Sequence, residues 1–221
     1  MKIYHLLIIT VFIAFEAGTA SFAEEESTYN PHYGMSAAVA IVPFYGGASG
    51  PTTPISETNY PDTFDTGIGT RLEIFYDWTP AWRYYLGGVY NKWEGKFFRG
   101  GEFPEGAQFD DFRMAGIYIG VKYRFNQGSP WRPYLMGNLG LVSLSAIDVT
   151  VDDAEIPYWK KTYRDYLDMG VGIEYSLTGN VAVFLDYRLE LAGKPNSINF
   201  PIAEATGSSS FPITFGIDFS Y

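Results

Sequence analysis

A strict alternation of apolar and polar residues constrains the fold of this chain more than any other feature. Between Tyr166 and Leu177 every second residue is apolar, and the residues between them are charged, polar or glycine. The apolar positions are Leu167, Met169, Val171, Ile173, Tyr175 and Leu177. The segment 181–191 repeats the pattern after a short turn at 178–180. A period of two is typical of β-strands, and no helical period is sustained, so the sequence predicts an all-β fold.

Eight segments follow this plan, and their connectors are alternately short and long. The predicted strands are 33–45, 66–78, 82–93, 114–125, 134–145, 166–177, 181–191 and 211–221. The long connectors are 46–64, 96–112, 147–165 and 192–210. An even number of strands with short turns at one end and long loops at the other is typical of barrels that span a membrane. We therefore predict an eight-stranded antiparallel up-and-down transmembrane β-barrel over residues 33–221.

A soluble barrel with its apolar residues inside is the alternative. The polar face argues against it because that face also carries glycines, which weaken a solvated strand but make room inside a narrow barrel. These glycines are Gly67, Gly69, Gly116, Gly120, Gly170, Gly172 and Gly216. Aromatic residues gather at the strand ends beside the short turns, as they do at a lipid headgroup boundary. They are Trp78, Trp82, Tyr84, Tyr123, Phe125, Trp131, Tyr134, Tyr175 and Tyr221.

The amino terminus predicts export. Lys2 precedes an apolar stretch at 6–15, and the following Ser21-Phe22-Ala23 has small residues where a signal peptidase would cleave. We predict a signal peptide over residues 1–23, cleaved after Ala23, and a short segment 24–32 before the barrel. The alternative, an uncleaved anchor, is disfavoured by the short apolar core and the acidic run at 24–26.

Composition excludes two classes of function. The chain has no cysteine, so a disulfide-stapled domain and thiol chemistry are excluded. Its formal net charge of −10, without a cluster of Lys or Arg, argues against nucleic acid as a partner.

The final strand carries the most specific motif, Thr214-Phe215-Gly216-Ile217-Asp218-Phe219-Ser220-Tyr221. A polar residue, a glycine two positions later, and aromatics at the third-last and last positions resemble the signal read by the outer-membrane barrel-assembly machinery. With the alternating strands and the WRPYLMGNLGLV stretch, the motif resembles the small OmpA-like and opacity-type outer-membrane β-barrel family. The resemblance implies a bacterial outer-membrane location, contact with lipid and lipopolysaccharide, and an assembly role for Gly216, Phe219 and Tyr221.

Charged residues on the polar face are predicted to line the interior. They are Arg71, Glu73, Asp77, Arg83, Lys122, Arg124, Asp168, Glu174, Asp186, Arg188, Glu190 and Asp218. An eight-stranded barrel has an interior that side chains can fill, and buried charges require partners, so we expect a salt-bridged plug. The alternative is a narrow gate, lined by Arg71, Glu73, Asp186, Arg188 and Glu190, whose pairings exchange. Asp218 is expected to pair with Arg83, Arg124 or Lys122.

Enzymatic and metal sites are not indicated. Some outer-membrane barrels modify lipid A with a His, Ser and acidic residue, but His32 is the single histidine of the predicted mature chain and lies before the first strand. The acidic run Asp148, Asp152, Asp153 and Glu155 lacks the spacing of a calcium loop and is interpreted as a solvated loop. We predict no catalytic residue, no metal and no cofactor.

The loops carry aromatic residues beside cations, in two groups. One is Phe97, Phe98, Phe103 and Arg99; the other is Tyr158, Trp159, Lys160 and Lys161. Such residues either anchor an extracellular ligand or pack together to close the barrel mouth. The first functional hypothesis is an adhesin-like surface protein with its specificity in the loops. The second is a small porin, or an OmpW-like route for apolar solutes, which the less polar face of Ser36, Ala38 and Ala40 weakly supports. A lipid A-modifying enzyme is disfavoured.

Overall fold

The computed structural model describes residues 30–53, 56–100, 103–126, 128–198 and 205–221. The predicted signal peptide, 1–23, and the segment 24–29 lie outside the described residues. Eight long strands form the barrel: β1 (His32–Val42), β5 (Gly67–Asp77), β6 (Trp82–Trp93), β9 (Phe112–Arg124), β10 (Trp131–Leu144), β13 (Thr162–Ser176), β14 (Val181–Ala192) and β17 (Ile213–Ser220).

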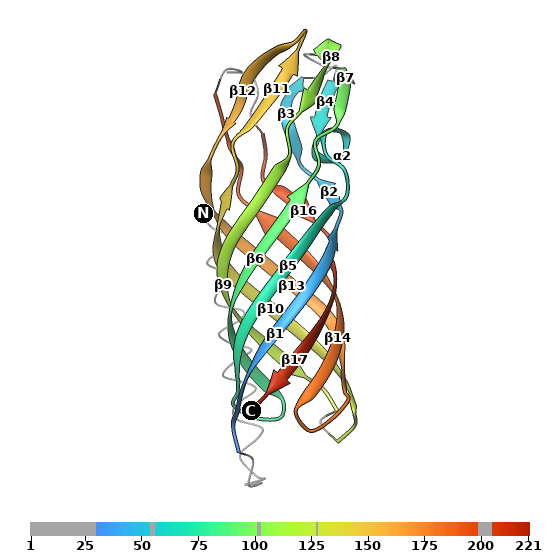
Figure 1. Ribbon diagram of the computed structural model, residues 1–221, viewed down its shortest axis with the longest axis vertical. Helices are drawn as coiled ribbons and strands as arrows, with labels where there is room; N and C mark the ends of the chain where they lie inside the picture. Colours follow the sequence, from blue (N-terminus) through green and yellow to red (C-terminus); the bar gives the residue numbers. More distant parts are fainter. Residues whose placement is uncertain (1–29, 54–55, 101–102, 127, 199–204) are drawn as a thin grey trace. The chain divides into compact units, whose positions relative to one another are not determined.

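The barrel is antiparallel and closed, as predicted. Each long strand pairs with its sequence neighbour among the eight, and β1 pairs with β17 from Gly34 opposite Ser220 to Ile41 opposite Ile213 (Figure 1). Closure leaves no long unpaired strand edge in this part of the chain, which is a requirement for crossing a bilayer with β-strands. No helix among the described residues is long and apolar enough to cross a membrane.

The predicted strand ends are close to the observed ones; the largest difference is at β13, which begins at Thr162 rather than Tyr166. The first predicted strand is wrong at its far end, because β1 stops at Val42 and Pro43 interrupts the ladder. Proline has no N–H to donate to a neighbouring strand. The chain resumes in β2 (Phe44–Gly46), which pairs with β16 (Ser208–Ser210).

The long connectors hold regular structure that the sequence analysis did not assign. Three of them supply β7 (Phe97–Gly100), β8 (Phe103–Phe109), β11 (Ile147–Val151), β12 (Ala154–Lys160) and β15 (Asn196–Ser197), which form one five-stranded sheet. The first connector forms the hairpin β3 (Ala48–Thr53) and β4 (Ser56–Asn59) and the single-turn helix α2 (Tyr60–Thr63). These elements lie at the end of the barrel opposite the chain's carboxyl terminus (Figure 1).

The outer face of the barrel is apolar along its length. Ile68 and Ile117 are 69% and 66% exposed, whereas the charged residues that alternate with them are buried. The prediction of an outward aromatic ring is wrong for Tyr134, which is 1% exposed and points into the barrel. In β10 the inward face also includes Met136 and Asn138, so Tyr134 has the parity of the interior.

An aromatic cluster fills the loop end of the barrel. Phe44 stacks on Trp93 with ring centroids 4.6 Å apart, and Trp93 stacks on Phe112 at 5.1 Å. Trp159 and Tyr60 pack on the same cluster with centroids 5.7 Å apart. We name Phe44, Tyr60, Phe64, Trp93, Phe112 and Trp159 the mouth cluster. Among the loop aromatics, Phe103, Tyr158 and Trp159 are buried and pack in the hydrophobic core at the loop end of the barrel. Phe97 is 62% exposed.

Candidate functional site

All twelve predicted interior charges point into the barrel, and none is more than 6% exposed. The pleat of each strand places them there: alternate residues of β5, β6, β9, β13, β14 and β17 face inward, and the charges occupy those alternate positions. They form two groups at different levels of the barrel, a loop-side network and a turn-side network.

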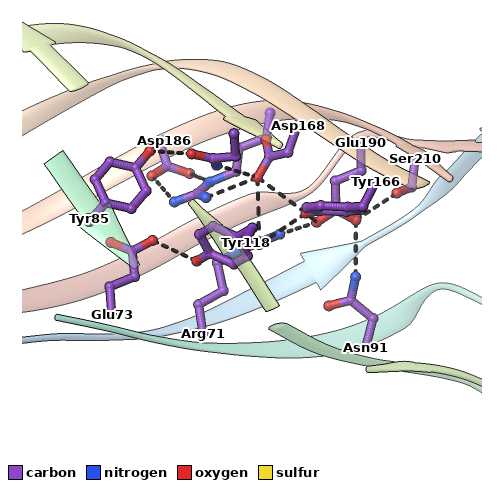
Figure 2. A network of polar contacts seen from close by, with 12 residues as sticks. Arg71, Glu73, Tyr85, Asn91, Tyr118, Tyr166, Asp168, Asp186, Glu190 and Ser210 are labelled. Carbon is purple, nitrogen blue, oxygen red and sulfur yellow. Dashed lines mark hydrogen bonds and ion pairs between the residues drawn. The ribbon is translucent and has the colours of Figure 1, made fainter. Parts of the chain in front are cut away.

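The loop-side network is centred on Arg188 and Arg71. Figure 2 shows Arg71 with the carboxylates of this network. Arg188 binds Asp186 through two hydrogen bonds of 2.7 and 2.9 Å, and its Nη1 donates to Asp168 at 3.2 Å. Arg71 forms an ion pair with Glu190, and its Nη1 lies 3.6 Å from Asp168. Asp168 on β13 therefore lies between two guanidinium groups, one from the neighbouring strand β14 and one from β5 across the bore.

Neutral side chains complete this network. Glu190 accepts hydrogen bonds from Tyr166 at 2.9 Å and from Asn91 and Ser210 at 3.0 Å each (Figure 2). The Tyr118 hydroxyl donates to Glu73 at 2.7 Å. Asn91 lies on β6 and Glu190 on β14, and Tyr118 lies on β9 and Glu73 on β5. These two hydrogen bonds therefore connect strands that are not neighbours in the sheet.

The turn-side network is built around Arg83. Arg83 donates to both oxygens of Asp77, at 2.7 and 3.0 Å, and forms an ion pair with Asp218. Arg124 bridges Asp77 at 3.1 Å and Glu174 at 3.2 Å. Of the three cations considered for Asp218, the structure pairs it with Arg83.

Aromatic rings separate the two networks. The Arg83 guanidinium lies 3.3 Å from the centroid of the Phe75 ring, and the Lys122 ammonium lies 4.3 Å from Tyr134 and 4.9 Å from Phe184. Cations are attracted to ring faces most strongly where water is excluded. The interior is thus layered as charge, aromatic, charge.

Glycines make room for these rings, as the sequence predicted. A Cβ at Gly172 would lie 2.4 Å from the Tyr134 ring, and a Cβ at Gly216 would lie 2.2 Å from the Phe184 ring. Any larger residue at either position would displace an interior aromatic side chain.

The predicted charges include seven carboxylates and five cations, so full pairing needs other donors. The tyrosine hydroxyl and asparagine amide groups supply them, and Arg132 adds a cation at 2.6 Å from Glu174. Burying an ionised group is costly unless it is paired and hydrogen-bonded. The predicted set lacks six residues of these networks: Tyr85, Asn91, Tyr118, Arg132, Asn138 and Tyr166. All six have the inward parity of the charges on their strands, so parity was the available signal, although Arg132 lies before the predicted start of its strand at 134.

Other predicted features lie outside this interior. His32 is exposed at the start of β1. Of the acidic loop residues, Asp148 and Glu155 lie close to Asp110, and a carboxylate oxygen of each lies within 4.8 Å of the other two. Asp152 and Asp153 are not part of this cluster and lie at a turn, where both have a positive φ. A cluster of exposed carboxylates is common without an ion, and we assign it no role.

The residues of the predicted assembly motif lie where β17 closes the barrel. Gly216 faces the interior and Phe219 faces outward at 43% exposure. The Tyr221 N–H donates to the carbonyl of Tyr33 at 2.8 Å, which extends the closing ladder by one residue. Their role in assembly remains a prediction.

The closed barrel has counterparts among known proteins. The model of a family described as "outer membrane protein beta-barrel domain" matches residues 8–219. No curated protein matches.

Solved structures with the same fold include Neisserial surface protein A (17% identity, 87% of this chain and 100% of that chain, TM-score 0.53). A major outer membrane protein from Thermus thermophilus has 10% identity over 87% and 100% of the chains, with a TM-score of 0.52. The outer membrane protease OmpT from Escherichia coli has 13% identity over 86% and 96%, with a TM-score of 0.46. At these identities, the likeness to the first two structures, whose TM-scores exceed 0.5, shows the fold alone.

Proposed function

This chain belongs to the outer membrane protein β-barrel domain family, and on that premise we propose that it is a non-enzymatic, adhesin-like surface protein. In this proposal the barrel is a sealed support in the bacterial outer membrane. The five-stranded sheet of β7, β8, β11, β12 and β15, which we name the loop sheet, is the part that binds other molecules. The observation that carries the proposal is the filled interior.

Two features support a sealed bore. The loop-side and turn-side networks occupy successive levels, with Arg71, Arg83 and Arg124 each at most 2% exposed. Above them the mouth cluster covers the loop end, where Trp93 is 1% exposed and its indole N–H donates to the carbonyl of Val42 at 2.7 Å. An aqueous path would have to break ion pairs and displace aromatic rings at more than one level.

The loop sheet supports an interaction role. Its inner face buries Phe103, Phe109, Val149 and Tyr158 against the mouth cluster, which gives the sheet a defined place on the barrel. Its strands come from three different connectors, joined by the pairing of Val149 with Phe109 and of Trp159 with Ser197. A surface assembled in this way is more rigid than separate loops, and rigidity lowers the entropy lost on binding.

Conductance tests the sealed bore. The purified barrel, inserted into a planar lipid bilayer in concentrated KCl, is expected to conduct no more than the bare bilayer, while a porin inserted under the same conditions shows its usual steps. Reproducible discrete openings would instead support the small-channel alternative, with the Arg71, Arg188 and Glu190 pairings as its gate.

Binding tests the loop sheet. We would replace residues 97–108, the β7–β8 hairpin, with a Gly-Ser segment and display the variant on bacteria. The matched control replaces residues 48–59, the β3–β4 hairpin, whose two strands pair with each other and belong to a separate sheet. Attachment to host cells or extracellular matrix is expected to fall for the first replacement only. Equal attachment by all three strains would contradict an adhesive role for this sheet.

Lipid A analysis tests the non-enzymatic part of the proposal. Overexpression of the chain is expected to leave the mass spectrum of lipid A unchanged, because the described interior holds no histidine beside a hydroxyl and a carboxylate. New species lacking or gaining an acyl chain would show that the barrel is an enzyme.

A further inference from the structure

Three cationic side chains lie on the outer wall of the barrel, at the loop-side end of its apolar band. Lys92 on β6 is the Cα partner of Arg113 on β9. The Arg113 N–H donates to the Ser145 Oγ at 3.0 Å, and the Ser145 N–H donates to the Arg113 carbonyl at 2.9 Å. Leu144 is the Cα partner of Thr162, and Ser145 and Lys161 are the residues that adjoin the end of this pairing. We name Lys92, Arg113 and Lys161 the cation row.

The wall on the membrane side of this row is apolar and aromatic. Ile117 and Leu141 are Cα partners and are both exposed on the outer face. Tyr163 is 70% exposed, and the Lys161 ammonium lies 5.9 Å from its ring centroid. An exposed tyrosine above exposed isoleucine and leucine is typical of the headgroup level of a bilayer. The cation row therefore lies at the height where lipid headgroups begin.

The wall on the loop side of the row is acidic and hollowed. Asp111 comes two residues before Arg113 on the same face, one step farther from the membrane, and its carboxylate lies 2.8 Å from Lys92 and 3.9 Å from Arg113. The hydrogen bond from Lys92 lowers the pKa of Asp111, so the carboxylate stays ionised and orients both cations. A polar groove of about 540 Å³ follows, lined by Gln108, Asp110, Asp111, Arg113 and Ser145.

From the membrane side to the loop side, the outer wall is therefore first apolar, then cationic at the cation row, and then anionic. We propose that the cation row binds the phosphate groups of a phosphorylated glycolipid in the outer leaflet, with the acyl chains against Ile117 and Leu141. Lys and Arg are the side chains that bind phosphate, Arg through two parallel hydrogen bonds and Lys as a point charge. A basic cluster beside a membrane-spanning segment attracts anionic headgroups.

The chemistry selects a lipid rather than a free anion. A phosphate that approaches from solution must pass the carboxylates of Asp110 and Asp111, which repel it. A phosphate that belongs to a lipid approaches from the membrane side and meets Arg113 and Lys161 first. The formal net charge of −10 on the whole chain adds to the repulsion of a free anion.

Native mass spectrometry of the detergent-solubilised barrel tests the proposal. The probes are lipid A with both phosphates, the same lipid after dephosphorylation, and inorganic phosphate. The test variant combines Arg113→Gln with Lys161→Gln, and Lys92 is left in place because it pairs with Asp111. The matched control combines Arg99→Gln with Lys194→Gln, which removes the same charge from exposed positions outside the row.

We expect the test variant to bind phosphorylated lipid A about 10-fold or more weakly than the wild type, while the control binds as the wild type does. Dephosphorylated lipid A is expected to bind equally weakly to all three, and Arg113→Lys is expected to retain binding. Equal affinities of the test and control variants for phosphorylated lipid A would overturn the proposal. So would binding of inorganic phosphate that matches binding of the lipid. Circular dichroism and the heat-dependent shift in gel mobility check that each variant is folded.

Discussion

Arg83 shows how a single residue inside the barrel links distant parts of the chain. Its guanidinium contacts Asp77 on β5 and Asp218 on β17, and its face lies on the Phe75 ring. The two carboxylates are 141 residues apart in sequence, from 77 to 218, and Arg83 is their shared partner. Removal of Arg83 would take a positive charge away from the buried carboxylates of Asp77 and Asp218. Loss of a partner from a buried charge costs far more stability than loss of a surface ion pair.

We therefore predict that Arg83→Gln lowers the free energy of unfolding by about 3–5 kcal/mol. The measurement is urea unfolding of the refolded barrel, followed by tryptophan fluorescence. A double variant, Arg83→Gln with Asp218→Asn, removes one of the stranded charges and is expected to regain part of the loss. If the double variant were the less stable of the two, the Arg83–Asp218 pair would not explain the effect.

Asp111 gives a pH prediction outside the membrane. Its pKa is lowered from the ordinary 3.8 by the hydrogen bond from Lys92. A carboxylate with a lowered pKa contributes stability above its ordinary pKa and loses that contribution as the pH falls through the lowered value in the folded state. The wild type is therefore expected to lose slightly more stability than Asp111→Asn as the pH falls from about 5 towards 2. Unfolding temperatures across that range measure the difference, which solvent screening keeps small.

At the scale of elements, close packing between neighbouring strands depends on the glycines that face the barrel interior. In β10 a Cβ at Gly140 would lie 2.2 Å from the carbonyl oxygen of Ile117, whereas a Cβ at Gly137 meets nothing within 4 Å. Gly140 has the inward parity of Asn138 and Val142, and Gly137 has the outward parity of Leu135 and Leu139. The same strand thus holds one glycine that packing requires and one that it does not.

This contrast predicts opposite outcomes for two matched substitutions. Gly140→Ala is expected to destabilise the barrel by about 1–3 kcal/mol because the backbone of β9 must shift. Gly137→Ala adds a methyl group facing lipid and is expected to be neutral within about 0.5 kcal/mol. Urea midpoints of the two variants, measured side by side, check the prediction; similar losses would show that inward position does not decide the cost.

The closing strand carries a prediction about assembly. Deletion of Tyr221 removes the final hydrogen bond of β17 to Tyr33 and the last aromatic residue of the predicted recognition motif. We expect the truncated chain to be secreted and processed normally but to insert into the outer membrane poorly. Membrane fractionation and gel mobility shift measure insertion, and normal insertion would contradict the assembly role of this residue.

At the scale of the whole barrel, the proposed seal has several levels. The mouth cluster closes the loop end, and the two charge networks fill the bore below it. If the bore is sealed as we propose, no single level has to carry the barrier to ions.

The repeated seal predicts that opening the mouth alone does not create a channel. Trp93→Ala removes the ring between Phe44 and Phe112 and is expected to cost about 3–5 kcal/mol of stability. Conductance in planar bilayers is nevertheless expected to stay at the baseline, because the loop-side network below remains intact. Discrete openings in this variant would identify the mouth cluster as the seal and the interior as conducting.

The sequence by itself determined the strand number, the antiparallel order and the inward or outward direction of nearly every barrel residue. It could do so because a β-strand has a period of two, so that direction follows from parity once one position is known. The same parity placed all twelve charges in the interior. Tyr134 is the exception: its place near a strand end favours lipid, but its parity is that of the interior, where it is buried.

Only the tertiary structure decided which charges meet. Parity states that Asp218 and Arg83 face inward, but their approach depends on the stagger and tilt with which eight strands close, and these are properties of the whole sheet. The loop sheet and the cation row also depend on the tertiary structure, because each joins residues from connectors or strands that are far apart in the chain. Local alternation carries no information about such contacts, because it describes a strand and not its partner.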